Sequence, residues 1–264
     1  MTKDNENYVF PWGFHLGDLT KGVDHIPLYT NSTDGGFCLL YDKASEKKVD
    51  NLLESLVLEL FMNMPKESLK VDMFDFGKKK FYHLSPLQPM QLYKVSYTKE
   101  MIRESFEALE ETIVSRHTDL LCCNRKTIDE HNQKSRMKKG YHLVLMHLAN
   151  FPNEEIELRR IQNFVDSAQQ AGVYVIAFGY EEMLQSESKS IQAILKGFKN
   201  INVSDGEFKI TEDIFEFMEL LDDHSFESLD LNKHDLLQQI LQKADLEKFM
   251  DPEAMKLEEN TKVK

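Results

Sequence analysis

Residues 37–64, FCLLYDKASEKKVDNLLESLVLELFMNM, decide the fold of this chain. The first five, FCLLY, form a compact apolar run that predicts a buried strand. A short polar break, DKAS, ends it at Ser45, a residue type that caps helices. Apolar residues then recur at helical spacing and predict an amphipathic helix along Val49, Leu52, Leu53, Leu56, Val57, Leu60 and Met64. Strand, tight loop and helix in this order are the setting of a phosphate-binding loop.

The rest of the chain repeats this alternation. Strands are predicted at 69–76, 141–147 and 173–178, and helices at 102–120, 126–138, 158–172 and 191–198. The strands are continuous apolar runs, which is typical of strands covered on both faces. We therefore expect an α/β fold with a mostly parallel central sheet and helices on both faces. Loops and short strands are expected at 8–36, irregular structure at 78–97, and acidic helices at 214–221 and 236–249.

Composition narrows the functional classes. Among 264 residues, 32 Lys and Arg stand against 45 Asp and Glu, for a net charge of −13. This balance argues against coating DNA or RNA, since neutralising phosphates requires concentrated positive charge. No apolar run approaches the roughly 20 residues of a membrane helix, and the polar start at 1–8 predicts no signal peptide. The three cysteines predict neither a disulfide framework nor, with the scattered histidines, a metal site.

The residues at 42–49 predict a phosphate-binding loop that has lost the residue types needed to bind a nucleotide. In such loops glycines let backbone N–H groups wrap the phosphates, a Lys reaches the outer phosphates and a Ser or Thr hydroxyl holds Mg²⁺. Lys48 has the position of that Lys, but no glycine is present and Val49 replaces the hydroxyl. Asp42 and Glu46 add negative charge where a triphosphate needs positive charge. We expect a vestigial nucleotide-binding loop made of Asp42, Ser45, Lys47, Lys48 and Val49.

The second half of such a site is an acidic residue at the end of a buried strand, where it holds Mg²⁺ or activates water. Here the matching strand ends in His147 and Leu148, and no carboxylate is present. His147 has two interpretations, a general base or a strand-end histidine satisfied by hydrogen bonds, and we favour the second. We therefore expect a degenerate acidic strand end and no catalytic residue.

The order of these segments resembles that of FtsK/SpoIIIE-type motor domains. The matching pieces are Gly36 to Glu59, the strand end Asp75-Phe76-Gly77, the helix ending in Arg116, the strand Gly140 to His147 and the stretch Ala171 to Ile176. Trp12 to Asp18 and Phe74 to Gly77 are most similar to a C-terminal ATPase domain of the type VII secretion motor, the EssC/EccC family. The resemblance covers roughly residues 10–205 and implies a RecA-like P-loop NTPase scaffold.

The resemblance also implies what this domain lacks. The family's glycines fall at Asp42, Ser45 and Lys47, its Ser or Thr at Val49, and its acidic pair at His147 and Leu148. It implies a degenerate domain that does not itself hydrolyse ATP, so we expect no cofactor here and ATP with Mg²⁺ in the parent motor. That motor would be multimeric and would lie at the cytoplasmic face of the cell membrane, anchored through another part of a longer chain.

For such a domain the resemblance implies substrate recognition and regulation of the upstream motor. The expected partners are the C-terminal tails of WXG100-type secretion substrates and the preceding motor domain, with no nucleic acid. Apolar anchors would bind such a tail, and the candidate surface is Phe81, Tyr82, Leu87, Met90, Leu92 and Tyr93. Core packing of these side chains is an equally weighted alternative, and the C-terminal helices are a second candidate surface.

We divide the chain into an N-terminal segment or linker at 1–35, a degenerate ATPase domain at 36–222 and an acidic helical extension with a frayed tail at 223–264. Two other functions stay open. Lys48 would support an active nucleotide hydrolase or DNA translocase completed by a neighbouring subunit. The same scaffold would also suit an interaction module outside secretion.

Two smaller features have ordinary interpretations. The basic run Lys78-Lys79-Lys80 is expected to be a solvated turn. The stripe of Phe215, Phe217, Met218 and Leu221 at helical spacing is expected to pack in the core.

Overall fold

The structure, a computed structural model, describes residues 8–77, 79, 81–122 and 124–243. The strands are β1 (Gly13–Lys21), β2 (Asp24–Asn31), β3 (Gly36–Tyr41), β4 (Leu69–Phe74), β5 (Tyr93–Ser96), β6 (Tyr141–His147), β7 (Val173–Tyr180), β8 (Lys199–Ser204), β9 (Glu207–Lys209) and β10 (Ser225–Ser228). The α-helices are α1 (Glu46–Asn63), α2 (Lys99–Asp119), α3 (Ile128–Lys134), α4 (Leu158–Ser167), α5 (Lys189–Gly197), α6 (Glu219–Asp223) and α7 (Lys233–Lys243).

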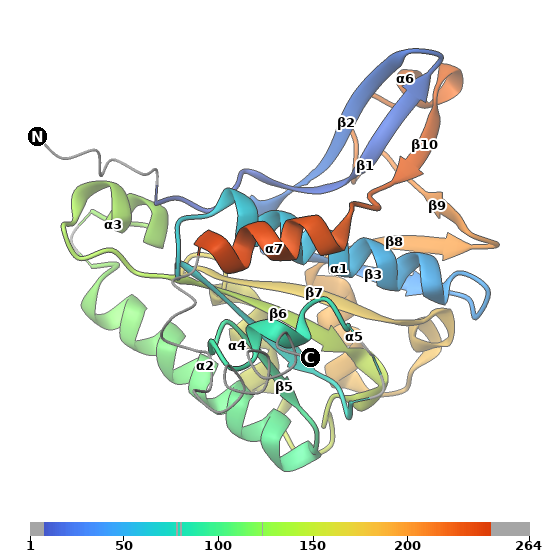
Figure 1. Cartoon of the computed structure of the whole chain (residues 1–264). Coiled ribbons are helices and arrows are strands. Elements are labelled where there is room, and N and C mark those ends of the chain that lie inside the picture. The colour runs from blue at the N-terminus through green and yellow to red at the C-terminus, as the bar shows by residue number, and fades with distance from the viewer. Residues whose placement is uncertain (1–7, 78, 80, 123, 244–264) are drawn as a thin grey trace, which may run out of the picture.

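A seven-stranded sheet forms the centre of the molecule (Figure 1), with the strand order β5-β4-β6-β7-β3-β8-β9. Every pair in it is parallel except β8 with β9. A smaller antiparallel sheet has the order β10-β1-β2. The predicted α/β fold with a mostly parallel central sheet is confirmed.

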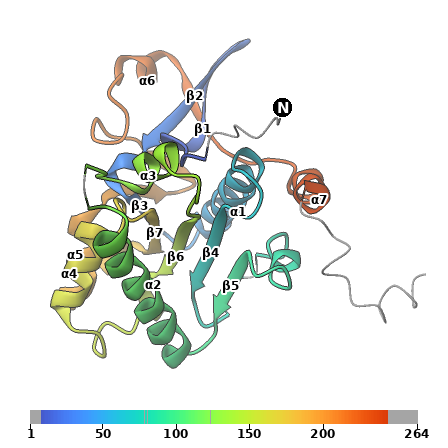
Figure 2. The ribbon, with the colours of Figure 1, turned by 90° about the vertical axis from the view of Figure 1, so that its left-hand side faces the viewer.

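Alternate residues of the central strands face two separate cores. Leu39 and Phe178 pack on the side of α1, whereas Leu40 and Ala177 pack on the side of α2, α4 and α5. Figure 2 shows α1 and α7 on one side of the sheet and α2, α4 and α5 on the other. All six residues of β3 are buried. This is why its apolar run does not alternate with polar residues, since both faces of the strand are covered.

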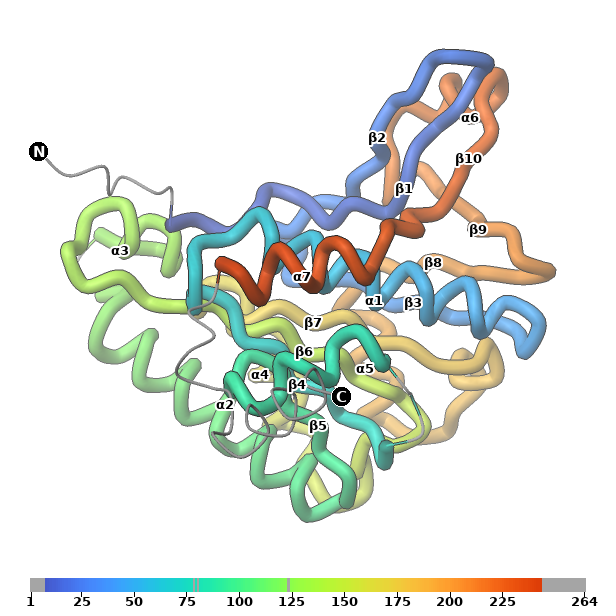
Figure 3. The backbone as a smooth tube through the Cα atoms, in the orientation of Figure 1, coloured from blue at the N-terminus to red at the C-terminus, as the bar shows by residue number. Residues whose placement is uncertain are grey.

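The second sheet joins segments from opposite ends of the described chain. β1 and β2 form an antiparallel hairpin, and β10 pairs with the other edge of β1, with Leu19 opposite Phe226. Figure 3 traces these three strands side by side above the central sheet. The expectation of short strands at 8–36 was wrong in length, because β1 and β2 span 9 and 8 residues. The helical extension expected after 222 contains strand β10, whose pairing depends on the distant β1.

Helix α7 packs along α1. Its apolar residues Leu237 and Ile240 are buried. The ammonium of Lys243 donates to the backbone oxygens of Met62 and Met64, at 3.1 and 2.6 Å. These carbonyls lie at the carboxyl end of α1, where a positive charge is favourable. The apolar stripe of this helix thus packs within this chain. The rest of the predicted 236–249 helix and the frayed tail lie outside the described residues.

Four further predictions needed correction. The segment 78–97 was expected to be irregular, but it includes strand β5 at the edge of the sheet. The polar helix expected at 126–138 is shorter, since α3 ends at Lys134. The helix expected at 214–221 is mostly a set of turns, and α6 begins only at Glu219. Phe217 in that segment has 57% of its surface exposed, so it does not pack in the core as expected. The domain boundaries at 35 and 222 stay a prediction.

An ion-paired histidine connects the small sheet with helix α1. The Nδ1 atom of His15 on β1 lies 3.0 Å from Glu59 Oε1 on α1, and its Nε2 atom lies 3.5 Å from Asp18 Oδ1. Burial by itself would lower the pKa of His15, but the hydrogen bond and charge of Glu59 and the charge of Asp18 outweigh it, so the pKa is raised. A raised pKa stabilises the fold below the ordinary histidine value of 6.5, and this contribution is lost as pH rises through the folded-state pKa.

We predict that His15→Gln removes part of the pH dependence of stability. Between about pH 5.5 and pH 8.5, the wild type should lose more free energy of unfolding than the variant, because only the wild type releases the proton bound between the two carboxylates. Urea unfolding followed by circular dichroism at both pH values measures this difference. The matched control is His25→Gln on the same hairpin, where the side chain is exposed. Equal pH dependence in wild type and His15→Gln would contradict the assignment.

Candidate functional site

The fold locates the candidate site at the carboxyl edge of the central sheet. There the ends of β3, β4, β6 and β7 meet the beginning of α1. In the sheet β7 lies between β3, which precedes the loop at 42–45, and β6, which ends in His147. Ligands of parallel α/β sheets bind at this edge, outside the carboxyl ends of the strands. Both halves of the site suggested by the sequence therefore lie along one edge.

The loop after β3 is a tight turn. Only residues 42–45 separate the strand from α1, and the backbone N–H of Ser45 donates to the carboxylate and the carbonyl of Asp42, at 2.8 and 3.2 Å. Lys47 and Lys48 lie in the first turn of the helix, and Val49 is buried in the core. The turn is too short to wrap phosphate groups with a succession of backbone N–H donors, as a phosphate-binding loop does.

The hairpin turn between β8 and β9 packs directly on this loop. The backbone N–H of Asp205 donates to Asp42 Oδ2 at 2.7 Å, and that of Gly206 donates to Ser45 Oγ at 2.9 Å. The Nζ atom of Lys48 donates to the Gly206 carbonyl at 2.7 Å. The hydroxyl of Ser45 was expected to cap α1, but it accepts this hydrogen bond and caps nothing. Three of the five vestigial-loop residues are thus used to hold the hairpin.

The electrostatics of the loop follow from these contacts. Hydrogen bonds from Ser45 and from the backbone of Asp205 lower the pKa of Asp42. The ammonium of Lys48 lies 5.6 Å from the centre of the Phe208 ring on β9. The negative charge of Asp42, unfavourable for a triphosphate, therefore binds the β8–β9 turn.

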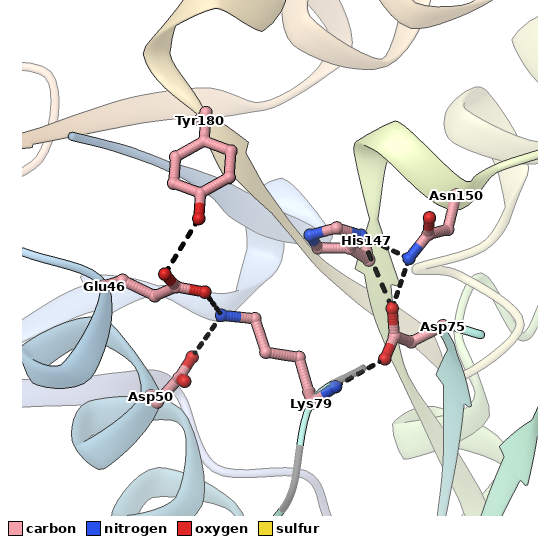
Figure 4. Close-up of polar contacts among 7 residues, drawn as sticks. All are labelled: Glu46, Asp50, Asp75, Lys79, His147, Asn150 and Tyr180. Atoms are coloured by element: carbon pink, nitrogen blue, oxygen red, sulfur yellow. Dashed lines mark hydrogen bonds and ion pairs between the residues drawn. The ribbon is translucent and has the colours of Figure 1, made fainter. Parts of the chain in front are cut away.

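A buried polar cluster occupies the neighbouring strand ends (Figure 4). Asp75, directly after β4, is 1% exposed, and His147 at the end of β6 and Asn150 just beyond it are 5% and 4% exposed. The Nδ1 atom of His147 lies 3.5 Å from Asp75 Oδ1 and 2.7 Å from Asn150 Nδ2, and the amide of Asn150 also donates to Asp75. Leu148 is fully buried. His147 is thus a hydrogen-bonded residue at a strand end, the interpretation favoured from the sequence.

Lys79 closes the space between this cluster and α1. Its backbone N–H donates to Asp75 Oδ2 at 2.8 Å. Its ammonium lies 2.7 Å from Glu46 Oε1 and 2.8 Å from Asp50 Oδ1, and its side chain is only 5% exposed. The hydroxyl of Tyr180 at the end of β7 donates to the other oxygen of Glu46 at 2.8 Å (Figure 4). The expectation that Lys79 lies in a solvated turn was therefore wrong; Lys78 and Lys80 lie outside the described residues.

The ionisation of this group follows from its burial and charges. Burial by itself would lower the pKa of Lys79, but Asp50 and Glu46 outweigh it and raise the pKa, so the side chain stays protonated. The hydrogen bond from Lys79 lowers the pKa of Glu46, whereas burial raises that of Asp50. Burial also raises the pKa of Tyr41, whose ring lies 5.3 Å from the ammonium, to about 12.

Sequence reasoning missed most of this cluster. Asp75 was noticed only as part of a strand end, although its place directly after a buried strand is a signal for the carboxyl edge. The sequence positions of Lys79 and Asn150 carry no comparable signal, because each reaches the cluster from a turn. The donor set also differs from one that holds Mg²⁺ with a nucleotide, since Val49 is buried, and Glu46 and Asp50 are both ion-paired with Lys79.

The aromatic segment proposed as a partner surface is mostly inside the molecule. Five of its six side chains are buried, namely Phe81, Leu87, Met90, Leu92 and Tyr93. Tyr82 is 73% exposed. This burial agrees with the alternative of core packing and leaves Tyr82 as the one member available at the surface.

Neither a metal-binding cluster nor a helix suited to crossing a membrane occurs among the described residues. Within residues 8–77, 79, 81–122 and 124–243, no group of three or more His, Cys, Asp and Glu side chains is arranged to hold a metal ion. Across the same ranges, none of the helices combines the length and the apolar character that a membrane crossing requires.

Comparison with known proteins adds the following. No family model matches the sequence, and no curated protein matches it. Among solved structures, EssC (ATPases 2 and 3) from Geobacillus thermodenitrificans aligns with a TM-score of 0.63 and 14% identity, over 89% of this chain and 49% of that one. The pCW3 conjugation coupling protein TcpA, in its monomer form with ATPγS, aligns with a TM-score of 0.61 and 14% identity, over 90% and 72%. EccC (ATPases 2 and 3) from Thermomonospora curvata, in complex with a signal sequence peptide, aligns with a TM-score of 0.59 and 8% identity, over 92% and 49%.

The chain has the fold of the EssC and EccC ATPase domains. The fold implied by the FtsK/SpoIIIE-type resemblance, a RecA-like P-loop ATPase scaffold, is thereby confirmed. At these identities the likeness establishes the fold alone. The chain spans about half the length of the EssC and EccC chains that it matches.

We predict that Lys79, and not Lys48, is the lysine on which stability depends. Lys79→Met should cost about 2 kcal/mol of unfolding free energy, because it leaves Glu46 and Asp50 without their cation in a poorly hydrated place. Lys48→Met is the matched control, since this exposed lysine makes its hydrogen bond at the surface and such contacts contribute at most about 1 kcal/mol. Guanidinium unfolding of both variants at neutral pH measures the difference. A larger loss in Lys48→Met would contradict the assignment.

Proposed function

We propose that this chain is an ATPase-like domain of a type VII secretion motor that does not hydrolyse ATP and that acts in substrate recognition and in regulation of the motor domain before it. The observation that carries the proposal is the filled carboxyl edge of the sheet. Where an active motor domain would need room and donors for a nucleotide, this chain has hydrogen bonds and ion pairs between its own residues.

Three features support the absence of hydrolysis. The β8–β9 turn is hydrogen-bonded to Asp42, Ser45 and Lys48, the residues that would face phosphate. Lys79 holds the carboxylates at the start of α1. His147 is hydrogen-bonded to Asn150 at the strand end, where the family has its acidic pair. Hydrolysis of ATP with Mg²⁺ would then belong to another domain of the parent motor.

The assignment to secretion is supported by the fold and by charge. EssC and EccC domains share the architecture, and one EccC structure contains a signal sequence peptide. The net charge of −13 disfavours a nucleic-acid substrate. On this proposal the partners are the tails of WXG100-type substrates and the preceding motor domain, in a multimeric motor at the cytoplasmic face of the membrane.

We predict that the isolated chain does not bind ATP·Mg²⁺ and that repairing the loop alone does not restore binding. The variant Asp42→Gly/Ser45→Gly/Lys47→Gly/Val49→Thr recreates the residue types of a phosphate-binding loop. It should still show no heat of binding by titration calorimetry up to about 1 mM ATP, because the buried Lys79 side chain still fills the space beside the loop.

The control for this experiment is the same variant with Lys79→Ala added, whose circular dichroism spectrum is checked first. Micromolar affinity or measurable turnover in the wild type would overturn the proposal of an inactive site. Recovery of affinity in the four-residue variant would show that only the loop residues had prevented binding. That second result would favour the alternative of a nucleotide hydrolase with a decayed loop.

We predict that the chain binds secretion-substrate tails and not duplex DNA. Synthetic C-terminal peptides of WXG100-type proteins from the same genome should bind saturably in fluorescence anisotropy. A labelled duplex of about 20 base pairs should not bind at physiological salt, since an acidic surface repels phosphates. A scrambled tail peptide is the matched control. Binding of the duplex in preference to the tails would support a translocase and contradict the secretion assignment.

A further inference from the structure

An aromatic groove lies far from the carboxyl edge, between the β1–β2 hairpin and the turns at 211–220. It has a volume of about 600 Å³, and Ile26, Pro27 and Leu220 contribute to its walls. Lys199, at the amino end of β8, also lines it. The groove is therefore near the opposite edge of the sheet from Lys79 and the loop at 42–45.

Two exposed aromatic side chains border this groove. Trp12 is 68% exposed and packs against Tyr29 with ring centres 4.9 Å apart. Phe217 is 57% exposed and packs edge-to-face against Phe215 at 5.8 Å. Each pair belongs to a different wall, so the groove presents aromatic surface from both sides. Large apolar side chains gathered at one exposed place are typical of an interaction site.

The rim of the groove carries unbalanced negative charge. Asp213 and Glu216 line it, and both are exposed. In the part of the chain that the structure describes, neither makes an ion pair, and the exposed Glu212 and Glu219 lie in the same segment. The one lysine of the lining, Lys199, is paired with Asp34 at 2.8 Å. The groove therefore combines an aromatic floor with a negative potential that complements a positively charged partner.

We propose that this groove binds a protein segment that carries an aromatic or aliphatic anchor flanked by Lys or Arg. The anchor packs between Trp12 and Phe217, where apolar burial and ring contacts provide most of the affinity. A flanking cation contacts an aromatic face and the carboxylates of Asp213 and Glu216. This assignment does not rest on the secretion proposal, since it uses none of the residues at the carboxyl edge.

Charge also separates this partner from two other occupants. The chain's own last segment, 244–264, has six Asp and Glu against four Lys and is therefore net acidic. A second copy of the chain brings a net charge of −13. Both would meet repulsion at the acidic rim, whereas a basic segment is attracted.

The test uses the fact that Trp12 is the only tryptophan of the chain. Peptides are selected from a random, tryptophan-free displayed library on the full chain, with counter-selection on Phe217→Ser, and selected peptides are then titrated while tryptophan emission is recorded. We expect Lys or Arg beside an aromatic or aliphatic residue in the selected sequences, and emission that shifts to shorter wavelength as Trp12 is covered. Binding should weaken as salt rises from about 0.1 M to 0.5 M, since the Debye length falls.

Variants assign the binding to the groove. Phe217→Ser should weaken binding at least about tenfold, as expected for a central aromatic anchor. Asp213→Lys/Glu216→Lys should weaken it several-fold. Tyr82→Ser is the matched control, because Tyr82 is also an exposed aromatic residue but lies in another segment, and it should leave affinity unchanged.

Three results would overturn the proposal. The first is a library without enriched binders, or with binders that lack basic residues. The second is binding that Phe217→Ser leaves intact. The third is an emission shift that appears on raising the protein concentration without peptide, because a second copy would then be the occupant.

Discussion

Polar groups at the carboxyl edge of a parallel sheet must find partners, and in this chain the ammonium group of Lys79 provides the central one. It lies between Glu46 and Asp50 on α1, while the backbone N–H of the same residue binds Asp75 beyond β4. One residue thereby connects the end of β4 with the first turns of α1. Because the Lys79 side chain is 5% exposed, water does little to weaken its attraction to the two carboxylates. Glu46, Asp50 and Asp75 thus obtain partners from the chain itself.

The loop after β3 is held in a second, separate way. The β8–β9 turn reaches across to Asp42, Ser45 and Lys48, so residues with the positions of a phosphate-binding loop serve as a contact for a hairpin. Asp205 and Gly206 both have positive φ, which lets the turn bring two consecutive N–H groups toward the loop. The two contacts come from different parts of the chain. A substitution in one of them therefore leaves the other in place.

The acidic residues behind the net charge of −13 have different surroundings in different parts of the molecule. At the carboxyl edge, Glu46 and Asp50 are paired with Lys79. On the rim of the groove, Asp213 and Glu216 are exposed beside Trp12 and Phe217. Paired carboxylates stabilise the fold, whereas exposed and unbalanced ones create a potential that acts on partners. The same composition thus supports a closed interior site and an open surface site at opposite edges of the sheet.

The sequence by itself determined the α/β architecture, because two local patterns carry it. The apolar run of β3 indicates a strand covered on both faces, and the stripe of α1 indicates a helix with one buried face. It also established that residues 42–49 contain no glycine and that position 49 is a valine without a hydroxyl, since these are matters of residue type. Only the tertiary structure decided that Lys79 is buried, that β10 pairs with β1, that Phe81, Leu87 and Tyr93 are core, and that Phe217 is exposed at the same groove as Trp12. These features depend on segments far apart in the chain, and the energy of an ion pair, a strand edge or an aromatic contact is set by the environment that the complete fold creates around it.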